Sequence, residues 1–233
     1  MSIPPCSSKP EAAAGALQAG EGPGGAPRLT LLHADGDWIV VDKPAGLPSV
    51  PGRAPGLQDC VASRVQALHP DALVVHRLDM ATSGLLLMAR GADNQRRLGA
   101  AFERRQVDKS YVALVAGEPR EDEGQVDLPL AADWPRRPRR VVDPVGGKPA
   151  LTRWRVIERL GPCTRVQLEP LTGRTHQLRV HLGAIGHPIL GDTLYAGDAV
   201  AAATPRLMLH ACRLALAHPV DGRPCRFVSP VPF

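Results

Sequence analysis

Short apolar runs separated by turn residues dominate this chain and predict a protein rich in β-strands. We expect one strand shortly after Trp38 and further strands at residues 73–75, 85–89, 111–115, 124–130, 151–160, 164–170, 207–217 and 224–228. Helical spacing of apolar residues recurs at 57–68, 94–106 and 175–184. Many strands with a few interspersed helices predict an α+β fold with a mixed, largely antiparallel central sheet flanked by helices and loops.

Two of the predicted helices carry further detail. Residues 94–106 place Leu98, Ala101 and Phe102 on one face, and Asp93 is the expected N-cap. The helix at 175–184 has an apolar stripe with Arg179 at its margin, from which the guanidinium can reach inward.

Composition separates a tail from one folded domain. Residues 1–28 are rich in Ala, Gly, Pro and Ser and predict a disordered tail, whereas residues 29–233 predict a single catalytic domain. No apolar stretch reaches the length of a signal core or a transmembrane helix, so we expect a cytoplasmic protein that does not contact a membrane. The five cysteines are widely spaced, and we expect them to be reduced.

The net charge of +5 is carried almost entirely by arginine, since only four of the 28 basic residues are lysines. Arginine suits phosphate and base contacts, although a GC-rich genome would give the same composition. Within 133–143, four arginines lie among prolines beside Trp134, which predicts an exposed loop without regular structure. They are Arg136, Arg137, Arg139 and Arg140. Contact with RNA phosphates and a merely solvated loop remain equal alternatives here.

The polar turn at residues 76–84 lies between two apolar runs, which would hold Asp79 on a rigid platform. The alternative is that its polar side chains only satisfy the turn. Familiar nucleotide-binding and hydrolase motifs are absent from the sequence. His176 and His181 are five residues apart, which places them on different faces of a helix and makes a shared metal ion unfavourable. A carboxylate, an arginine and an aromatic ring remain as candidates, namely Asp79, Arg179 and Tyr111. The sequence alone does not show that they meet in space.

Four segments resemble the RluA family of pseudouridine synthases and occur in the order found in that family. They are VDKPAGLPSV (41–50), HRLDMATSG (76–84), KSYVALV (109–115) and TGRTHQLRVHLGAIGHPILGD (172–192). The resemblance extends from about Leu29 to Phe233 and does not include the optional S4 domain of the family. Met80 and Ala81 after HRLD, and the segment DLPLAADWPRRP (127–138), resemble the subgroup that acts on both rRNA and tRNA.

The resemblance implies an isomerase that converts uridine to pseudouridine in RNA without a metal or an organic cofactor. It implies that Asp79 is the catalytic carboxylate, that Tyr111 packs on the flipped base and is a candidate for removing the C5 proton, and that Arg179 is the salt-bridge partner of Asp79. Arg77 resembles the residue that enters the RNA stack when the base flips. His76, Arg174 and the four loop arginines complete the expected RNA-binding set.

The implied substrates are position 746 of 23S rRNA and position 32 of tRNA anticodon loops, each in a stem-loop. Three alternatives stay open: a basic RNA-binding module without catalysis, a synthase of the same family with another target uridine, and a hydrolase using Asp79 with His76 or His176. We expect a monomer, because no apolar stripe is left for a partner.

Overall fold

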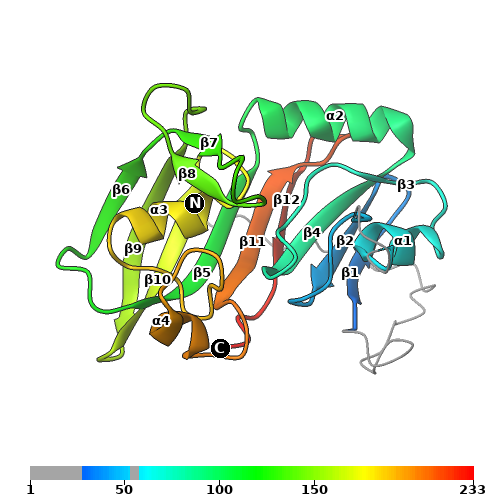
Figure 1. Ribbon diagram of the computed structural model, residues 1–233. Helices are drawn as coiled ribbons and strands as arrows, with labels where there is room; N and C mark the ends of the chain where they lie inside the picture. The colour runs from blue at the N-terminus through cyan, green and yellow to red at the C-terminus, as the bar shows by residue number, and fades with distance from the viewer. Residues whose placement is uncertain (1–27, 53–57) are drawn as a thin grey trace. The chain divides into compact units, whose positions relative to one another are not determined.

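A computed structural model describes residues 28–52 and 58–233 (Figure 1). The predicted tail at 1–28 therefore lies outside the described residues except for Arg28. The chain forms two compact units. The first unit runs to Asp108 and also takes in Ala211–Val231, and the second unit comprises Lys109–His210 with Pro232–Phe233.

The first unit is a sheet with a helix packed on β4. Its elements are β1 (Thr30–Ala34), β2 (Trp38–Lys43), α1 (Val61–Gln66), β3 (Ala72–Val74), β4 (Ser83–Arg90), α2 (Gly91–Glu103), most of β11 (Leu209–Ala217) and β12 (Pro224–Val228). The pairs β1–β2, β2–β4, β3–β4 and β11–β12 are antiparallel, and β11 lies next to β4 in the strand order.

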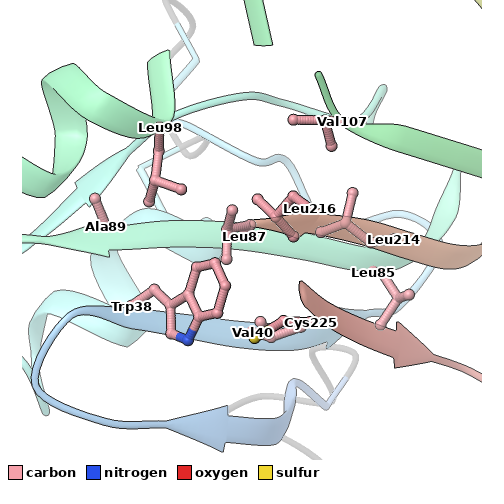
Figure 2. Packing of buried hydrophobic residues seen from close by; sticks show 10 residues of the cluster. All are labelled: Trp38, Val40, Leu85, Leu87, Ala89, Leu98, Val107, Leu214, Leu216 and Cys225. Atoms are coloured by element: carbon pink, nitrogen blue, oxygen red, sulfur yellow. The ribbon is translucent and has the colours of Figure 1, made fainter. Parts of the chain in front are cut away.

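Strand β4 is buried along all but its last residue, which explains why its residues 84–89, GLLLMA, are an unbroken apolar run rather than an alternating one. One of its faces contributes Leu85, Leu87 and Ala89 to a core that also contains Trp38. Figure 2 shows Leu98 pointing from α2 into this core. The prediction that Leu98 faces inward is confirmed.

Helix α2 begins three residues earlier than predicted, at Gly91, and its N-cap is Arg90. The prediction of Asp93 as N-cap is therefore wrong, because Asp93 lies in the first turn of the helix. The chain passes from β4 into α2 without a loop, and Gly91 adopts a φ of +74° that glycine tolerates. An aspartate in the first turn still interacts favourably with the helix dipole.

The second unit is built on an antiparallel sheet in the order β5–β10–β9–β6. These strands are β5 (Asp108–Ala116), β10 (Cys163–Pro170), β9 (Leu151–Arg159) and β6 (Glu123–Asp127). The unit also contains helices α3 (Gln177–Ala184) and α4 (Asp198–Ala202) and a two-stranded sheet of β7 (Leu130–Ala132) and β8 (Arg140–Val142). Leu130, Ala150 and Val180 form a buried cluster.

Strand β8 corrects one prediction, because residues 133–143 were expected to lack regular structure. Arg140 pairs with Ala132 and Val142 with Leu130, so the second half of the segment is a strand. The prolines precede this strand and do not interrupt its hydrogen bonds. Over residues 28–52 and 58–233, the helices are too short or too polar to cross a bilayer.

Candidate active site

A buried lysine holds the turn that carries Asp79 by hydrogen bonds to the backbone. Lys43 ends β2 and has no exposed surface. Its Nζ donates to the backbone carbonyls of Pro44, Leu47 and Met80 at 2.9, 2.8 and 3.0 Å. An ammonium group has three N–H donors, so this arrangement uses all of them. Lys43 thus joins the segment after β2 to the residue that follows Asp79.

Ser49 fixes the residue that precedes Asp79. Its Oγ donates to the carbonyl oxygen of Leu78 at 2.7 Å and accepts from the Leu78 backbone N–H at 3.0 Å. The backbone N–H of Thr82 also donates to the carbonyl oxygen of Asp79 itself, at 3.1 Å. The backbone is therefore anchored on both sides of Asp79, whose side chain is half-buried.

The turn ends at Gly84, where the strand order places β4 beside β11. Gly84 has a φ of +111°, and a Cβ there would lie 2.3 Å from the carbonyl oxygen of Ala211. Only glycine fits such a position, because both the backbone conformation and the space exclude a side chain. The glycine in the predicted turn thus allows the close approach of two strands.

His76 holds the other end of the turn. Its Nε2 accepts a hydrogen bond from the Leu87 backbone N–H at 3.0 Å, and its ring stacks on Phe102 with centroids 4.5 Å apart. This Nε2 therefore carries no proton. Arg77 follows and is exposed. His76 thus has a structural contact within the first unit, and the RNA contact expected of it remains a prediction.

Arg179 has a carboxylate partner that the sequence analysis missed. In the second unit its Nε and Nη2 donate to Oδ2 and Oδ1 of Asp192 at 2.8 and 2.7 Å. The two side chains are only 5% and 1% exposed. Bidentate geometry of this kind fixes the plane of the guanidinium group. The sequence predicted Asp79 as the partner, and Asp79 belongs to the first unit.

Tyr195 is a second residue that the sequence analysis missed. The guanidinium of Arg179 lies 5.1 Å from its ring centroid. Its hydroxyl accepts from the Arg140 backbone N–H at 2.8 Å and lies 2.5 Å from Nδ1 of His176. His176, at the N-cap of α3, has a φ of 58°, which is unusual for a residue with a side chain. The sequence has only two tyrosines, and this scarcity was the one signal that could have marked Tyr195 as a candidate site residue.

Tyr111 is half-buried on β5, where it pairs with Leu168 of β10. Two residues before it, burial lowers the pKa of Lys109. Arg174 is exposed, and its Nε donates to the carbonyl oxygen of Pro149 at 3.1 Å. The strand predicted around Tyr111 is confirmed, and its catalytic role remains a prediction.

The four arginines predicted to contact RNA differ in their environments. Arg136 pairs with Asp133 at 2.7 Å, and the guanidinium of Arg137 lies 3.6 Å from the ring centroid of Trp134, which is 68% exposed. Arg139 is half-buried and donates to the carbonyl oxygen of Leu194. Arg140 is half-buried in β8. Arg136 and Arg137 are exposed, and of the four they are the better placed to meet a ligand.

His181 is a structural histidine. It is fully buried, its Nδ1 lies 2.9 Å from Oγ1 of Thr152, and its Nε2 lies 3.0 Å from the carbonyl oxygen of Leu128. A carbonyl can only accept, so Nε2 carries the proton. Burial lowers the pKa of His181, which favours this neutral form.

The family model for RNA pseudouridylate synthase matches residues 37–184, and the chain belongs to this family. The match includes Asp79, Tyr111 and Arg179. The protein is therefore an isomerase that acts on RNA, as predicted from the motifs, and the non-catalytic alternative is not favoured.

Individual relatives support the same family. The chain is 49% identical over 208 residues to the dual-specificity RNA pseudouridine synthase RluA of Escherichia coli K12, covering 89% of this chain and 95% of that protein. It is also 49% identical over 200 residues to RluA of Yersinia pestis, covering 85% and 97%.

The fold matches as well. A solved structure of human RNA pseudouridylate synthase domain containing 1 has a TM-score of 0.74 and 30% identity, covering 88% of this chain and 84% of that one. The predicted α+β pseudouridine synthase fold is thus confirmed.

Proposed function

We propose that this protein is a dual-specificity synthase that converts uridine to pseudouridine at position 746 of 23S rRNA and at position 32 of tRNA anticodon loops. The observation that carries the proposal is the 49% identity to relatives named as dual-specificity enzymes, which extends over 95% of their length. Met80 and Ala81, in the subgroup motif, lie in the same turn as Asp79.

We propose that Asp79 is the nucleophile. The backbone contacts at Leu78 and Met80 support this role, because they fix the main chain on both sides of Asp79 and so hold the residue in one position. In the reaction the carboxylate attacks the nucleotide, the bond from uracil N1 to the sugar breaks, the ring turns, and C5 bonds to the sugar carbon. The C5 proton leaves, Asp79 is released, and no second substrate is consumed.

Tyr111 packs on the flipped base and Arg179 pairs with Asp79 in this proposal. The bidentate contact with Asp192 engages Nε and Nη2 of Arg179. Asp192 then acts as the positioning residue that fixes the guanidinium plane.

Arg77 is exposed next to the anchored turn, which supports its proposed entry into the RNA stack as the base leaves. Arg174, Arg136 and Arg137 are exposed as well and are proposed to contact phosphates. We also propose that the enzyme is cytoplasmic and acts as a monomer. Light scattering of the purified chain in the presence and absence of RNA tests the monomeric state directly.

Dual specificity is tested by measuring kcat/KM for an rRNA stem-loop and a tRNA anticodon stem-loop with the same preparation. Each RNA should inhibit modification of the other competitively, with an inhibition constant equal to its own KM under conditions of slow chemistry. If the enzyme modifies only one RNA and does not bind the other, the family assignment stands but the proposal of dual specificity is wrong.

A further inference from the structure

Three side chains that can ligate a metal ion converge in the first unit, away from the Asp79 turn. Asp35 and Asp37 lie between β1 and β2, and His218 follows β11. One ligand atom from each lies within 4.8 Å of the others. In the pairing of β2 with β4, Trp38 is opposite Ala89 and Lys43 is opposite Gly84. The cluster therefore lies at the far end of β4 from the turn that carries Asp79.

The histidine of this cluster has an unsatisfied nitrogen directed at the carboxylates. The side chain of His218 is 4% exposed, and its Nε2 forms no hydrogen bond within the described part of the chain. This atom lies 3.5 Å from Oδ2 of Asp37 and 3.9 Å from Oδ2 of Asp35. A buried nitrogen without a partner is costly, so its position requires an explanation.

The opposite nitrogen of the ring lies close to a third carboxylate. Nδ1 of His218 accepts a hydrogen bond from the Val220 backbone N–H at 3.4 Å and lies 3.2 Å from Oδ1 of Asp221. When Nε2 ligates a metal ion, the ring proton moves to Nδ1, the hydrogen bond from Val220 is given up, and Asp221 becomes the acceptor. The same carboxylate–histidine arrangement orients ligands in metal sites. Trp38 packs edge-on against the imidazole, with centroids 4.8 Å apart.

Both aspartates are held by hydrogen bonds, and Oδ2 of Asp35 also lies 2.9 Å from Nε2 of His33. A carboxylate oxygen has two lone pairs, so this contact leaves Oδ2 able to ligate a metal ion. Oδ1 of Asp35 accepts from the backbone N–H groups of Asp37 and Trp38 at 2.8 and 3.0 Å, and Oδ1 of Asp37 accepts from Asn94 at 3.0 Å. In both residues Oδ2 is the atom nearest His218. Burial raises the pKa of Asp35, but hydrogen bonds from His33 and the two backbone amides outweigh it and lower the pKa below its ordinary value.

We propose that Asp35, Asp37 and His218 bind a divalent transition-metal ion such as Zn²⁺ and thereby join the β1–β2 turn to the β11–β12 turn. Metal–ligand bonds of about 2.0–2.2 Å in tetrahedral geometry place donor atoms roughly 3.3–3.6 Å apart, so the separations of 3.5 and 3.9 Å need only a small contraction. Two carboxylates balance the charge of the ion. This site is structural and takes no part in the isomerisation, for which the family resemblance implies no metal.

Calorimetric titration of the full, EDTA-treated chain with ZnCl₂ tests the proposal. We expect one saturable site and a higher melting temperature with Zn²⁺. His218→Gln and Asp37→Asn should each weaken binding at least tenfold and abolish the thermal shift. His69→Gln is the control, since His69 is a half-buried histidine of the first unit that lies outside the cluster, and this variant should bind Zn²⁺ like the wild type.

Absence of binding, or equal binding by His218→Gln and Asp37→Asn, would overturn the proposal and leave the cluster as a histidine among carboxylates. Cysteine is the main competing ligand, so Co²⁺ serves as a second probe. A thiolate charge-transfer band that accounts for all bound Co²⁺ would also overturn it. Cooperative melting in EDTA shows whether each variant folds. If His218→Gln does not fold, the binding measurement on Asp37→Asn tests the proposal.

Discussion

Nζ of Lys43 donates to the carbonyl oxygen of Met80 at 3.0 Å, across 37 positions of sequence, and so fixes the residue next to the proposed nucleophile Asp79. The same ammonium group serves two further carbonyls in the segment that follows β2. The buried Lys43 therefore links two backbone segments that are distant in sequence, and the backbone geometry around Asp79 depends on this link.

Lys43→Met should destabilise the protein and reduce kcat more than it raises KM. The substitution keeps most of the side-chain volume but leaves three carbonyls without their donor, at about 1–3 kcal/mol for the buried carbonyl of Leu47 and less for the part-buried carbonyls of Pro44 and Met80. Urea unfolding and steady-state kinetics measure the two effects. Lys148→Met is the control, because Lys148 is exposed. A wild-type rate in a folded Lys43→Met variant would show that the turn holds its geometry without this contact.

Asp192→Asn should lower the free energy of unfolding by about 3–5 kcal/mol, because it removes the negative charge that faces both Nε and Nη2 of the buried guanidinium of Arg179. It should also reduce activity, since Arg179 loses its fixed orientation. Asp198→Asn, at an exposed aspartate of α4, should change neither quantity by more than a few tenths of a kcal/mol. The account of the pair fails if Asp192→Asn unfolds at the wild-type denaturant concentration.

Stability should fall as the pH drops below about 6.5, in part because of His181. Burial lowers the pKa of His181 from its ordinary 6.5 in the folded state. The unfolded chain therefore binds more protons below that pH, and the free energy of unfolding decreases as the pH falls toward the folded-state pKa. His181→Gln should be less stable at pH 8 and show a shallower decline from pH 7 to pH 5, measured by urea titration at each pH. Parallel pH profiles would remove His181 as a contributor.

Arg136→Ser with Arg137→Ser should reduce the salt dependence of RNA binding. Each lost phosphate contact lowers the slope of log affinity against log salt by about 0.7–0.9, so the double variant should lose up to about 1.8. Fluorescence anisotropy with an anticodon stem-loop measures the slope. Arg96→Ser, on the exposed surface of α2, is the control. An unchanged slope would make the two loop arginines solvated surface residues. Arg139 is left intact, because its substitution would also break the contact with Leu194.

The strands could be predicted because their apolar runs are unambiguous, as in β4 and in β12, which has the predicted bounds. Helix α2 was placed too late, because Asp93 has the chemistry of an N-cap while the actual start depends on the backbone freedom of Gly91. The strand at Arg140 was missed because arginines among prolines indicate a loop.

The candidate site was less accessible to sequence reasoning, because its supports are tertiary. A lysine is expected at the surface, so nothing in the local pattern shows that Lys43 is fully buried. Asp192 is separated from Arg179 by a helix end and a turn, and only folding brings the two together. Asp79, Tyr111 and Arg179 are candidates from the residue pattern alone, whereas their individual roles come from the family resemblance and remain predictions.

Tritium release from RNA labelled with [5-³H]uridine tests the central claim most directly, since moving the sugar bond to C5 displaces the hydrogen there. Wild-type protein should release tritium from both an rRNA and a tRNA stem-loop. Asp79→Ala should release none while keeping its melting temperature and its affinity for RNA. Release at the wild-type rate by a folded Asp79→Ala variant would contradict the assignment of Asp79 as the nucleophile.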